Sequence, residues 1–82
     1  MNKEEVFNKI ADIVAEQFNI DRDTIKGDLN FKNDLDADSI DFVEFVLTLE
    51  NDFGTEISDE DAENIMTIDE AVDYVMSHSD NK

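Results

Sequence analysis

The fold of this chain is organised around the stretch LDADSID at residues 35–41, where a long polar connection ends and the most hydrophobic helix begins. Ser39 is the only serine or threonine between Thr24 and Thr48. Acidic residues surround it: Asp36, Asp38, Asp41 and Glu44. A serine at the start of a helix commonly serves only as its cap, because its oxygen accepts a free backbone N–H. The alternative is that Ser39 carries a covalent group, and these residues alone leave both readings open.

Size and composition predict one small domain that spans residues 1–82 and has a frayed tail at residues 77–82. The chain has 82 residues and no cysteine, which excludes disulfides, thiolate metal sites and a cysteine nucleophile. No apolar run approaches the length of a membrane span or of a secretory leader. We therefore expect a cytoplasmic monomer that does not insert into membranes.

Charge is the strongest global feature of the sequence. The chain has 23 acidic and 6 basic residues, which gives a formal net charge of −17. Such a field repels nucleic acid and anionic membranes, since both are bound through lysine and arginine, and it favours partners with basic patches. Self-repulsion should make the fold marginal at low salt. Hydrophobic residues make up 40% of the chain and recur at helical spacing, which argues against disorder.

The first helix is expected from Lys3 to Phe18. Asn2 can cap it, and Glu5 completes a capping-box pattern. The connection at residues 19–38 is rich in turn formers, and a loop of this length is uncommon in a compact domain. We expect it to contain a short helical turn and to be pinned by its apolar residues: Ile20, Ile25, Leu29, Phe31 and Leu35.

The second helix is expected from Ser39 or Ile40 to Phe53, and Gly54 should end it. One apolar stripe should face the core and comprises Phe42, Val46, Leu49 and Phe53, with Phe45 at its edge. A second stripe lies beside the polar side, flanked by Glu44 and Glu50, and comprises Ile40, Val43 and Leu47. The apolar arc is wider than that of an ordinary surface helix. Either the helix packs on two sides, or the second stripe is an exposed docking surface ringed by carboxylates.

Two further helices complete the prediction. Ser58 can cap a short helix from about Asp59 to Ile65. Thr67 and Glu70 form another capping box, and the last helix then runs to about Met76. No segment alternates like a strand over a useful length. The predicted fold is all-α, a four-helix bundle of three longer helices and one short helix, with a long loop between the first and the second.

The sequence offers little for catalysis, so we expect no enzyme. Its only histidine is His78, in the tail, which leaves Ser39 without a histidine base. The only glycines, Gly27 and Gly54, make no phosphate-binding loop.

The clustered acidic residues suggest calcium binding as an alternative function. Asp34, Asp36 and Asp38 imitate positions 1, 3 and 5 of a calcium loop. Ser39 and Phe45, however, stand where that loop needs a glycine and a glutamate. We therefore expect no dedicated metal site.

The chain resembles the acyl carrier protein family from about Val6 to Met76. The segment DADSID at residues 36–41 is similar to the family's Gly-Ala-Asp-Ser-Leu-Asp. The likeness continues in VEFV at residues 43–46, LENDF at 49–53, EISDEDAE at 56–63 and IDEAVDYV at 68–75. The resemblance implies a carrier of the bacterial type II fatty acid synthesis kind.

The resemblance also implies a cofactor and partners. A phosphopantetheinyl transferase would attach 4′-phosphopantetheine from coenzyme A to Ser39, and Asp38 would help to hold magnesium during the transfer. Acyl chains would then travel as thioesters to fatty acid synthesis enzymes with basic docking patches. The family's recognition helix corresponds here to Ile40, Asp41, Val43, Glu44, Leu47 and Glu50. The lining of an acyl-chain cavity would comprise Val46, Leu49, Phe53, Ile57, Ile65, Ile68 and Ala71.

Three departures from the family pattern bear on these expectations. Asp36 replaces the glycine of the motif, and Ile40 replaces leucine. Phe42 and Phe45 are bulkier than the family's usual residues, so they should shrink or reshape the cavity. The alternatives are a specialised carrier of the same fold, for polyketide, aminoacyl or other acyl groups, and an acidic calcium-binding or adaptor protein in which Ser39 stays unmodified.

Overall fold

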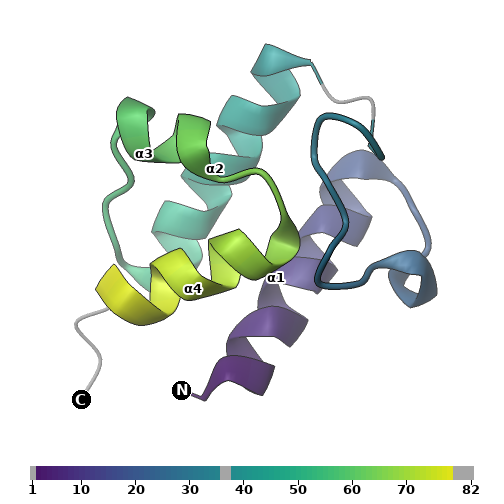
Figure 1. Cartoon of the computed structure of the whole chain (residues 1–82), viewed down its shortest axis with the longest axis horizontal. Coiled ribbons are helices and arrows are strands. Elements are labelled where there is room, and N and C mark those ends of the chain that lie inside the picture. Colours follow the sequence, from purple (N-terminus) through teal and green to yellow (C-terminus); the bar gives the residue numbers. More distant parts are fainter. Residues whose placement is uncertain (1, 36–37, 79–82) are drawn as a thin grey trace.

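The computed structural model describes residues 2–35 and 38–78, without the side chain of Ser39, and it is helical (Figure 1). Its helices are α1 (Lys3–Phe18), α2 (Ser39–Phe53), α3 (Asp59–Asn64) and α4 (Ile68–His78). A single 3₁₀ turn, η1 (Arg22–Thr24), lies in the loop between α1 and α2. The described residues form no strand, only an isolated bridge between Asn30 and Thr67. The predicted all-α fold, with three longer helices, one short helix and a long first loop, is confirmed.

Side-chain caps fix the helix starts where the sequence predicts them. Asn2 Oδ1 accepts the Glu5 N–H at 2.8 Å, and Glu5 Oε1 accepts the Asn2 N–H at 3.2 Å. Ser58 Oγ accepts the Asp61 N–H at 3.1 Å at the start of α3. Thr67 and Glu70 exchange the same pair of bonds at the start of α4, both 3.2 Å long. Each cap satisfies backbone donors that no helical carbonyl can reach.

Two predicted helix ends are wrong. α4 continues to His78, so Ser77 and His78 are helical and do not belong to a frayed tail. The last turn is held because the Tyr74 and His78 rings stack at 3.9 Å and Thr55 Oγ1 donates to the His78 carbonyl at 3.3 Å. The rest of the predicted tail, residues 79–82, lies outside the described residues. α3 ends at Asn64, because Ile65 takes an extended backbone and buries its side chain.

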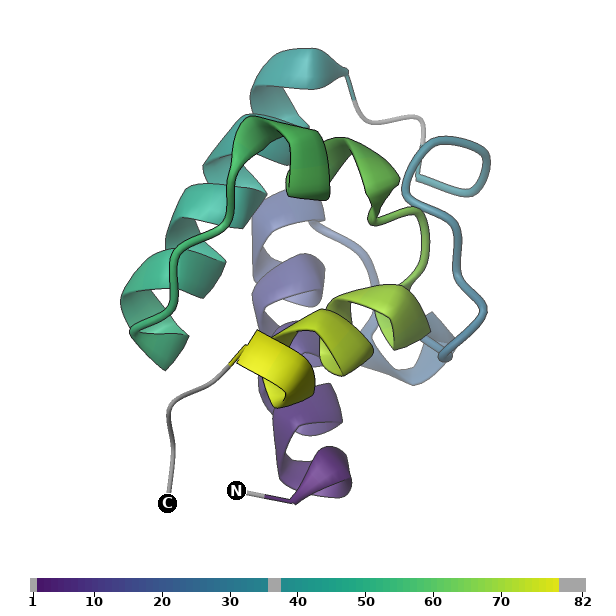
Figure 2. The same cartoon turned by 60° about the vertical axis from the view of Figure 1, so that its left-hand side comes forward.

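The core is built by α1, α2, α4 and the long loop. α1 packs against both α2 and α4, and α4 crosses α1 in both views (Figures 1 and 2). Val6, Ile10 and Val14 of α1 are buried, as their spacing predicts. α3 contributes no buried residue of its own. In the part of the chain that the structure describes, no helix is long and apolar enough to cross a bilayer.

Phe31 anchors the long loop in this core. Its side chain is 1% exposed, and its ring centroid lies 5.0 Å from that of Phe45 and 5.5 Å from that of Phe42. Phe18 of α1 reaches the same cluster, 6.1 Å from Phe45. Tilted ring pairs at these distances are attractive beyond the area they bury. The prediction that apolar residues pin the loop is confirmed for Phe31 and for Ile25, which is also buried.

Backbone hydrogen bonds tie the loop to the start of α4. The Phe31 N–H donates to the Met66 carbonyl at 2.9 Å, and the Ile68 N–H donates to the Leu29 carbonyl at 3.2 Å. The Asp69 N–H donates to the Gly27 carbonyl at 2.8 Å. A Cβ at Gly27 would meet the Asp69 carboxylate, so any larger residue there would require that exposed side chain to move. Figure 2 shows the loop running beside the start of α4.

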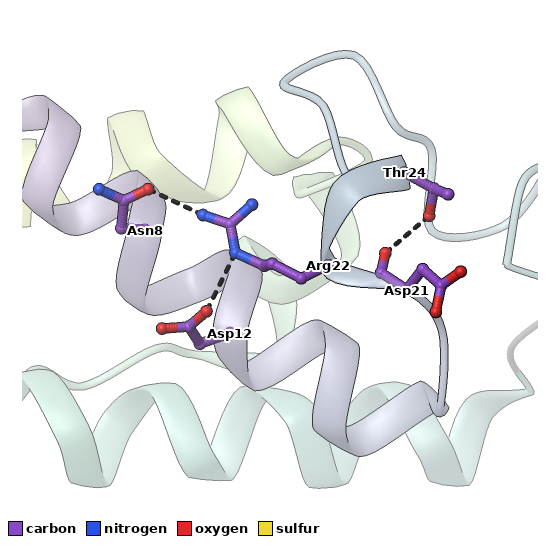
Figure 3. Close-up of polar contacts among 5 residues, drawn as sticks. All are labelled: Asn8, Asp12, Asp21, Arg22 and Thr24. Atoms are coloured by element: carbon purple, nitrogen blue, oxygen red, sulfur yellow. Dashed lines mark hydrogen bonds and ion pairs between the residues drawn. The ribbon is translucent and has the colours of Figure 1, made fainter.

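The first part of the loop is fastened to α1 by Arg22, in the predicted helical turn (Figure 3). Arg22 Nε donates to Asp12 Oδ1 at 3.0 Å, and Nη2 donates to Asn8 Oδ1 at 2.8 Å. The guanidinium also lies over the ring of Phe7, 5.6 Å from its centroid. Both ends of the loop are therefore attached to helices, which explains how a connection of this length stays compact.

Tyr74 of α4 holds the segment that contains α3. Its hydroxyl lies 2.9 Å from Asp61 Oδ2 and 3.2 Å from the Glu56 carbonyl oxygen. Burial, and then the hydrogen bond to Asp61, raise the pKa of the Tyr74 hydroxyl above its ordinary value of 10.0. The neutral phenol is the form that can donate to these oxygens.

Phe31→Ala should lower the free energy of unfolding by about 3–5 kcal/mol, because it removes a fully buried ring from the aromatic cluster. Urea unfolding followed by circular dichroism measures this change. Lys32→Ala is the matched control: its side chain is exposed, so the change should stay within about 0.5 kcal/mol. Equal effects of the two substitutions would contradict the anchoring role of Phe31.

Tyr74→Phe should cost about 1 kcal/mol at neutral pH, where the phenol hydrogen bond is intact. The folded-state pKa is raised, so this stability is fully present below about pH 10 and is lost as the pH rises through the folded pKa. Thermal unfolding of both proteins across alkaline pH should show their difference shrinking. Tyr74 is the only tyrosine, so phenolate absorbance reports its pKa directly. A gap in stability that stays constant with pH would contradict this role.

Candidate functional site

The start of α2 places Ser39 as the first helical residue. Asp38 is the N-cap, and its Oδ1 accepts the Asp41 N–H at 3.0 Å. Ser39 is therefore not the cap, because the residue before it has the extended backbone and the carboxylate that the cap requires. The Ser39 side chain and residues 36–37, including the departure at Asp36, lie outside what the structure describes.

This turn faces solvent at one end of the molecule. Asp38 and Asp41 are exposed, and Ile40 is 69% exposed. α2 begins at the end of the molecule opposite the start of α1 and the end of α4 (Figures 1 and 2). A macromolecule could approach the start of α2 there without displacing a helix.

The electrostatics of the turn favour one anionic group and oppose a second. The free N–H groups and the dipole at a helix N-terminus stabilise a phosphoester oxygen. Asp38 and Asp41 repel further negative charge, so a cation would have to accompany a phosphate that approaches. The cap uses one of the two Asp38 carboxylate oxygens. Among residues 2–35 and 38–78, no three histidine or acidic side chains are grouped to hold a metal ion.

The second apolar stripe of α2 is exposed. The exposed fractions are 69% for Ile40, 55% for Val43 and 53% for Leu47, whereas Leu49 is fully buried. Helix spacing alone left the stripe either packed or free, and the structure leaves it free because α1 covers only the other stripe. We call Ile40, Val43 and Leu47 the apolar strip.

The three acids assigned to recognition have different surroundings. Asp41 is exposed beside the apolar strip. Glu44 is exposed and accepts a hydrogen bond from Gln17 Nε2 of α1 at 3.2 Å. Glu50 is half-buried, and its carboxylate accepts the Ile57 N–H at 2.7 Å. This hydrogen bond attaches the segment between α2 and α3 to Glu50. The position of Glu50 in the sequence did not predict this contact.

The predicted cavity residues lie together in the core. The buried ones are Val46, Leu49, Ile57, Ile65, Ile68 and Ala71, and Phe53 is half-buried against them. Phe45 is fully buried and fills part of the same core, while Phe42 is half-buried. The acyl-chain cavity stays a prediction, and so does the effect of Phe42 and Phe45 on its size.

Sequence reasoning missed the contact of Gln17 with Glu44. Gln17 lies 27 positions before Glu44 and follows no motif, so nothing in the sequence links the two side chains. A helical wheel of residues 3–18 places it on the core face, between the buried Val6 and Ile10, which is the one signal that it would meet a neighbouring helix.

Comparisons with known proteins agree with this geometry. The family model for a phosphopantetheine attachment site matches residues 8–75. The chain is 64% identical over 78 residues to an acyl carrier protein of Lactobacillus johnsonii, covering 95% of this chain and 98% of the relative. An acyl carrier protein of Rubrobacter xylanophilus is 46% identical over 78 residues, covering 95% and 96%. The solved structure of the acyl carrier protein from Enterococcus faecalis has a TM-score of 0.83 and 56% identity, and the match covers 96% of this chain and all of that one.

The helical fold and the matched attachment site define a protein that bears phosphopantetheine. The chain belongs to the acyl carrier protein family.

The residues at the start of α2 fit this group. A phosphopantetheine arm needs an accessible serine at a helix start that can accept a phosphoester. The backbone of Ser39 occupies such a position between exposed neighbours, and Asp38 already supplies the cap. When bound, the group supplies a terminal thiol, a function that the cysteine-free chain lacks.

Proposed function

We propose that this chain carries acyl groups as thioesters on a 4′-phosphopantetheine arm joined to the Ser39 hydroxyl, and presents them to the enzymes of fatty acid synthesis. The observation that supports Ser39 most directly is its backbone position, the first residue of α2 after a cap made by Asp38. The cap does not depend on the Ser39 hydroxyl, so modifying that oxygen leaves the start of the helix intact.

The neighbours of Ser39 have separate roles in this proposal. The N-terminus of α2 stabilises the phosphoester oxygens through its free N–H groups. Asp38 keeps one oxygen on the Asp41 N–H, and its other oxygen would be available to hold a magnesium ion during transfer of the arm. Such an ion would supply positive charge against the repulsion between the carboxylates and a phosphate. We expect the chain itself to catalyse no step.

The apolar strip and its acids form the proposed docking surface. Ile40, Val43 and Leu47 provide exposed aliphatic area, and Asp41 and Glu44 provide negative charge at its border. A partner with a basic patch would be steered by the charges and held by the aliphatic contacts. Glu50 is better assigned to bracing the α2–α3 segment than to steering.

The first partner is a phosphopantetheinyl transferase, and the later ones are fatty acid synthesis enzymes with basic docking patches. Since residues 33–81 contain no lysine or arginine, α2 to α4 present one sign of charge to all of them. We also propose that the chain acts as a single-domain monomer in the cytoplasm, where coenzyme A and the transferase would meet it.

Incubation with a phosphopantetheinyl transferase, coenzyme A and magnesium tests the assignment of Ser39. The intact mass should increase by one phosphopantetheine on the unchanged protein and not at all on Ser39→Ala. Ser58→Ala is the matched control, because it removes a serine from another helix start and should be modified like the unchanged protein. Equal modification of Ser39→Ala, or none on the unchanged protein, would contradict the proposal.

A further inference from the structure

We propose that Gln17 of α1 is a positioning residue for partner docking, and that its side-chain amide holds the Glu44 carboxylate in the orientation a basic partner meets. This inference rests on the proposed function of the apolar strip and its acids as the docking surface. It extends that surface to a second helix, since Gln17 is the second-to-last residue of α1.

The contact is placed by the packing of the two helices. Gln17 Nε2 lies 3.2 Å from Glu44 Oε1. The next residue along each helix, Phe18 and Phe45, forms a ring pair with centroids 6.1 Å apart, and Phe45 is fully buried. A buried ring has little freedom to shift, so it fixes the register of α1 against α2. The amide and the carboxylate meet as a consequence of that register.

Glu44 differs in this respect from the other acids beside the strip. The Glu50 carboxylate is committed to the Ile57 N–H at 2.7 Å. At Asp41, the N–H donates to the Asp38 cap, and the side chain lies exposed on the first turn. The Glu44 carboxylate accepts its hydrogen bond from Gln17, a half-buried residue of another helix. Glu44 itself remains exposed beside Val43.

The chemistry of the donor matters for docking. An amide is neutral, so it restrains the Glu44 carboxylate without cancelling its charge. Only one carboxylate oxygen takes part, and the other can accept from a partner lysine or arginine. Holding a flexible acidic side chain in its bound orientation lowers the entropy that binding must remove. The contact should therefore slow dissociation of the complex. It should leave the association rate unchanged, because charge and long-range steering are the same with and without it.

The experiment measures association and dissociation rates with a phosphopantetheinyl transferase, by surface plasmon resonance at low and moderate salt. Gln17→Ala should weaken binding by about 2- to 10-fold, mainly through faster dissociation, with the salt dependence of association unchanged. Asn8→Ala is the matched control, because it removes another α1 amide whose bond goes to Arg22 instead. It should bind like the unchanged protein.

A double-mutant cycle separates positioning from a merely structural role. If Gln17 acts through Glu44, Gln17→Ala should have no further effect on dissociation in a Glu44→Ala background. An undiminished effect in that background would overturn the inference. Thermal unfolding of Gln17→Ala should match that of the unchanged protein, since exposed polar contacts contribute little to stability.

Charge reversal at Glu44 tests the proposed docking surface separately from the role of Gln17. Glu44→Lys should slow association several-fold at low salt and less at moderate salt. If it does so while Gln17→Ala binds normally, the positioning role is wrong and the docking surface stands. If neither substitution changes binding, the docking surface is wrong and the inference falls with it.

Discussion

Phe31 connects three parts of this molecule that are distant in sequence. Its ring is buried against Phe42 and Phe45 of α2, and its N–H donates to the Met66 carbonyl just before α4. The long loop that precedes α2 is thereby packed into the core instead of lying over the surface. The ring of Phe31 thereby contacts the first two turns of α2, and Phe45 also contacts α1 through Phe18. Because a packed segment loses little freedom on binding, this support suits the proposed presentation of Ser39 to partner enzymes.

The basic residues of this chain form their described contacts outside the apolar strip that is proposed for docking. Five of the six basic residues precede residue 33, and the described contacts of Lys3, Lys9 and Arg22 involve Asp73, Phe53 and Asp12. None of these contacts involves Ile40, Val43 or Leu47, and α2 itself contains no basic residue. None of the described ion pairs therefore involves an acid of α2, which agrees with the proposed docking role. The excess of negative charge destabilises the folded state through self-repulsion. Burial of the hydrophobic core must offset this repulsion.

Much of the fold follows from local rules that the sequence shows directly. Asn2 with Glu5, Ser58, and Thr67 with Glu70 predict helix starts because a cap depends only on neighbours in the chain. Position 38 shows the limit of such rules: both Asp38 and Ser39 can cap, and only the backbone angles decide for Asp38. The exposure of Ile40, Val43 and Leu47 depends on how many helices surround α2, which periodicity along one helix does not contain. The contacts of Glu50 with Ile57 and of Gln17 with Glu44 depend on tertiary packing in the same way.

The protein purified from its native host offers the most direct test of whether this chain serves as a carrier through an arm on Ser39. Intact mass followed by fragmentation of proteolytic peptides reports both the arm and its position. We predict phosphopantetheine on the peptide that contains Ser39, in part extended by an acyl group. An arm mapped to Ser58 or Ser77, or a protein that is entirely unmodified in the host, would contradict it.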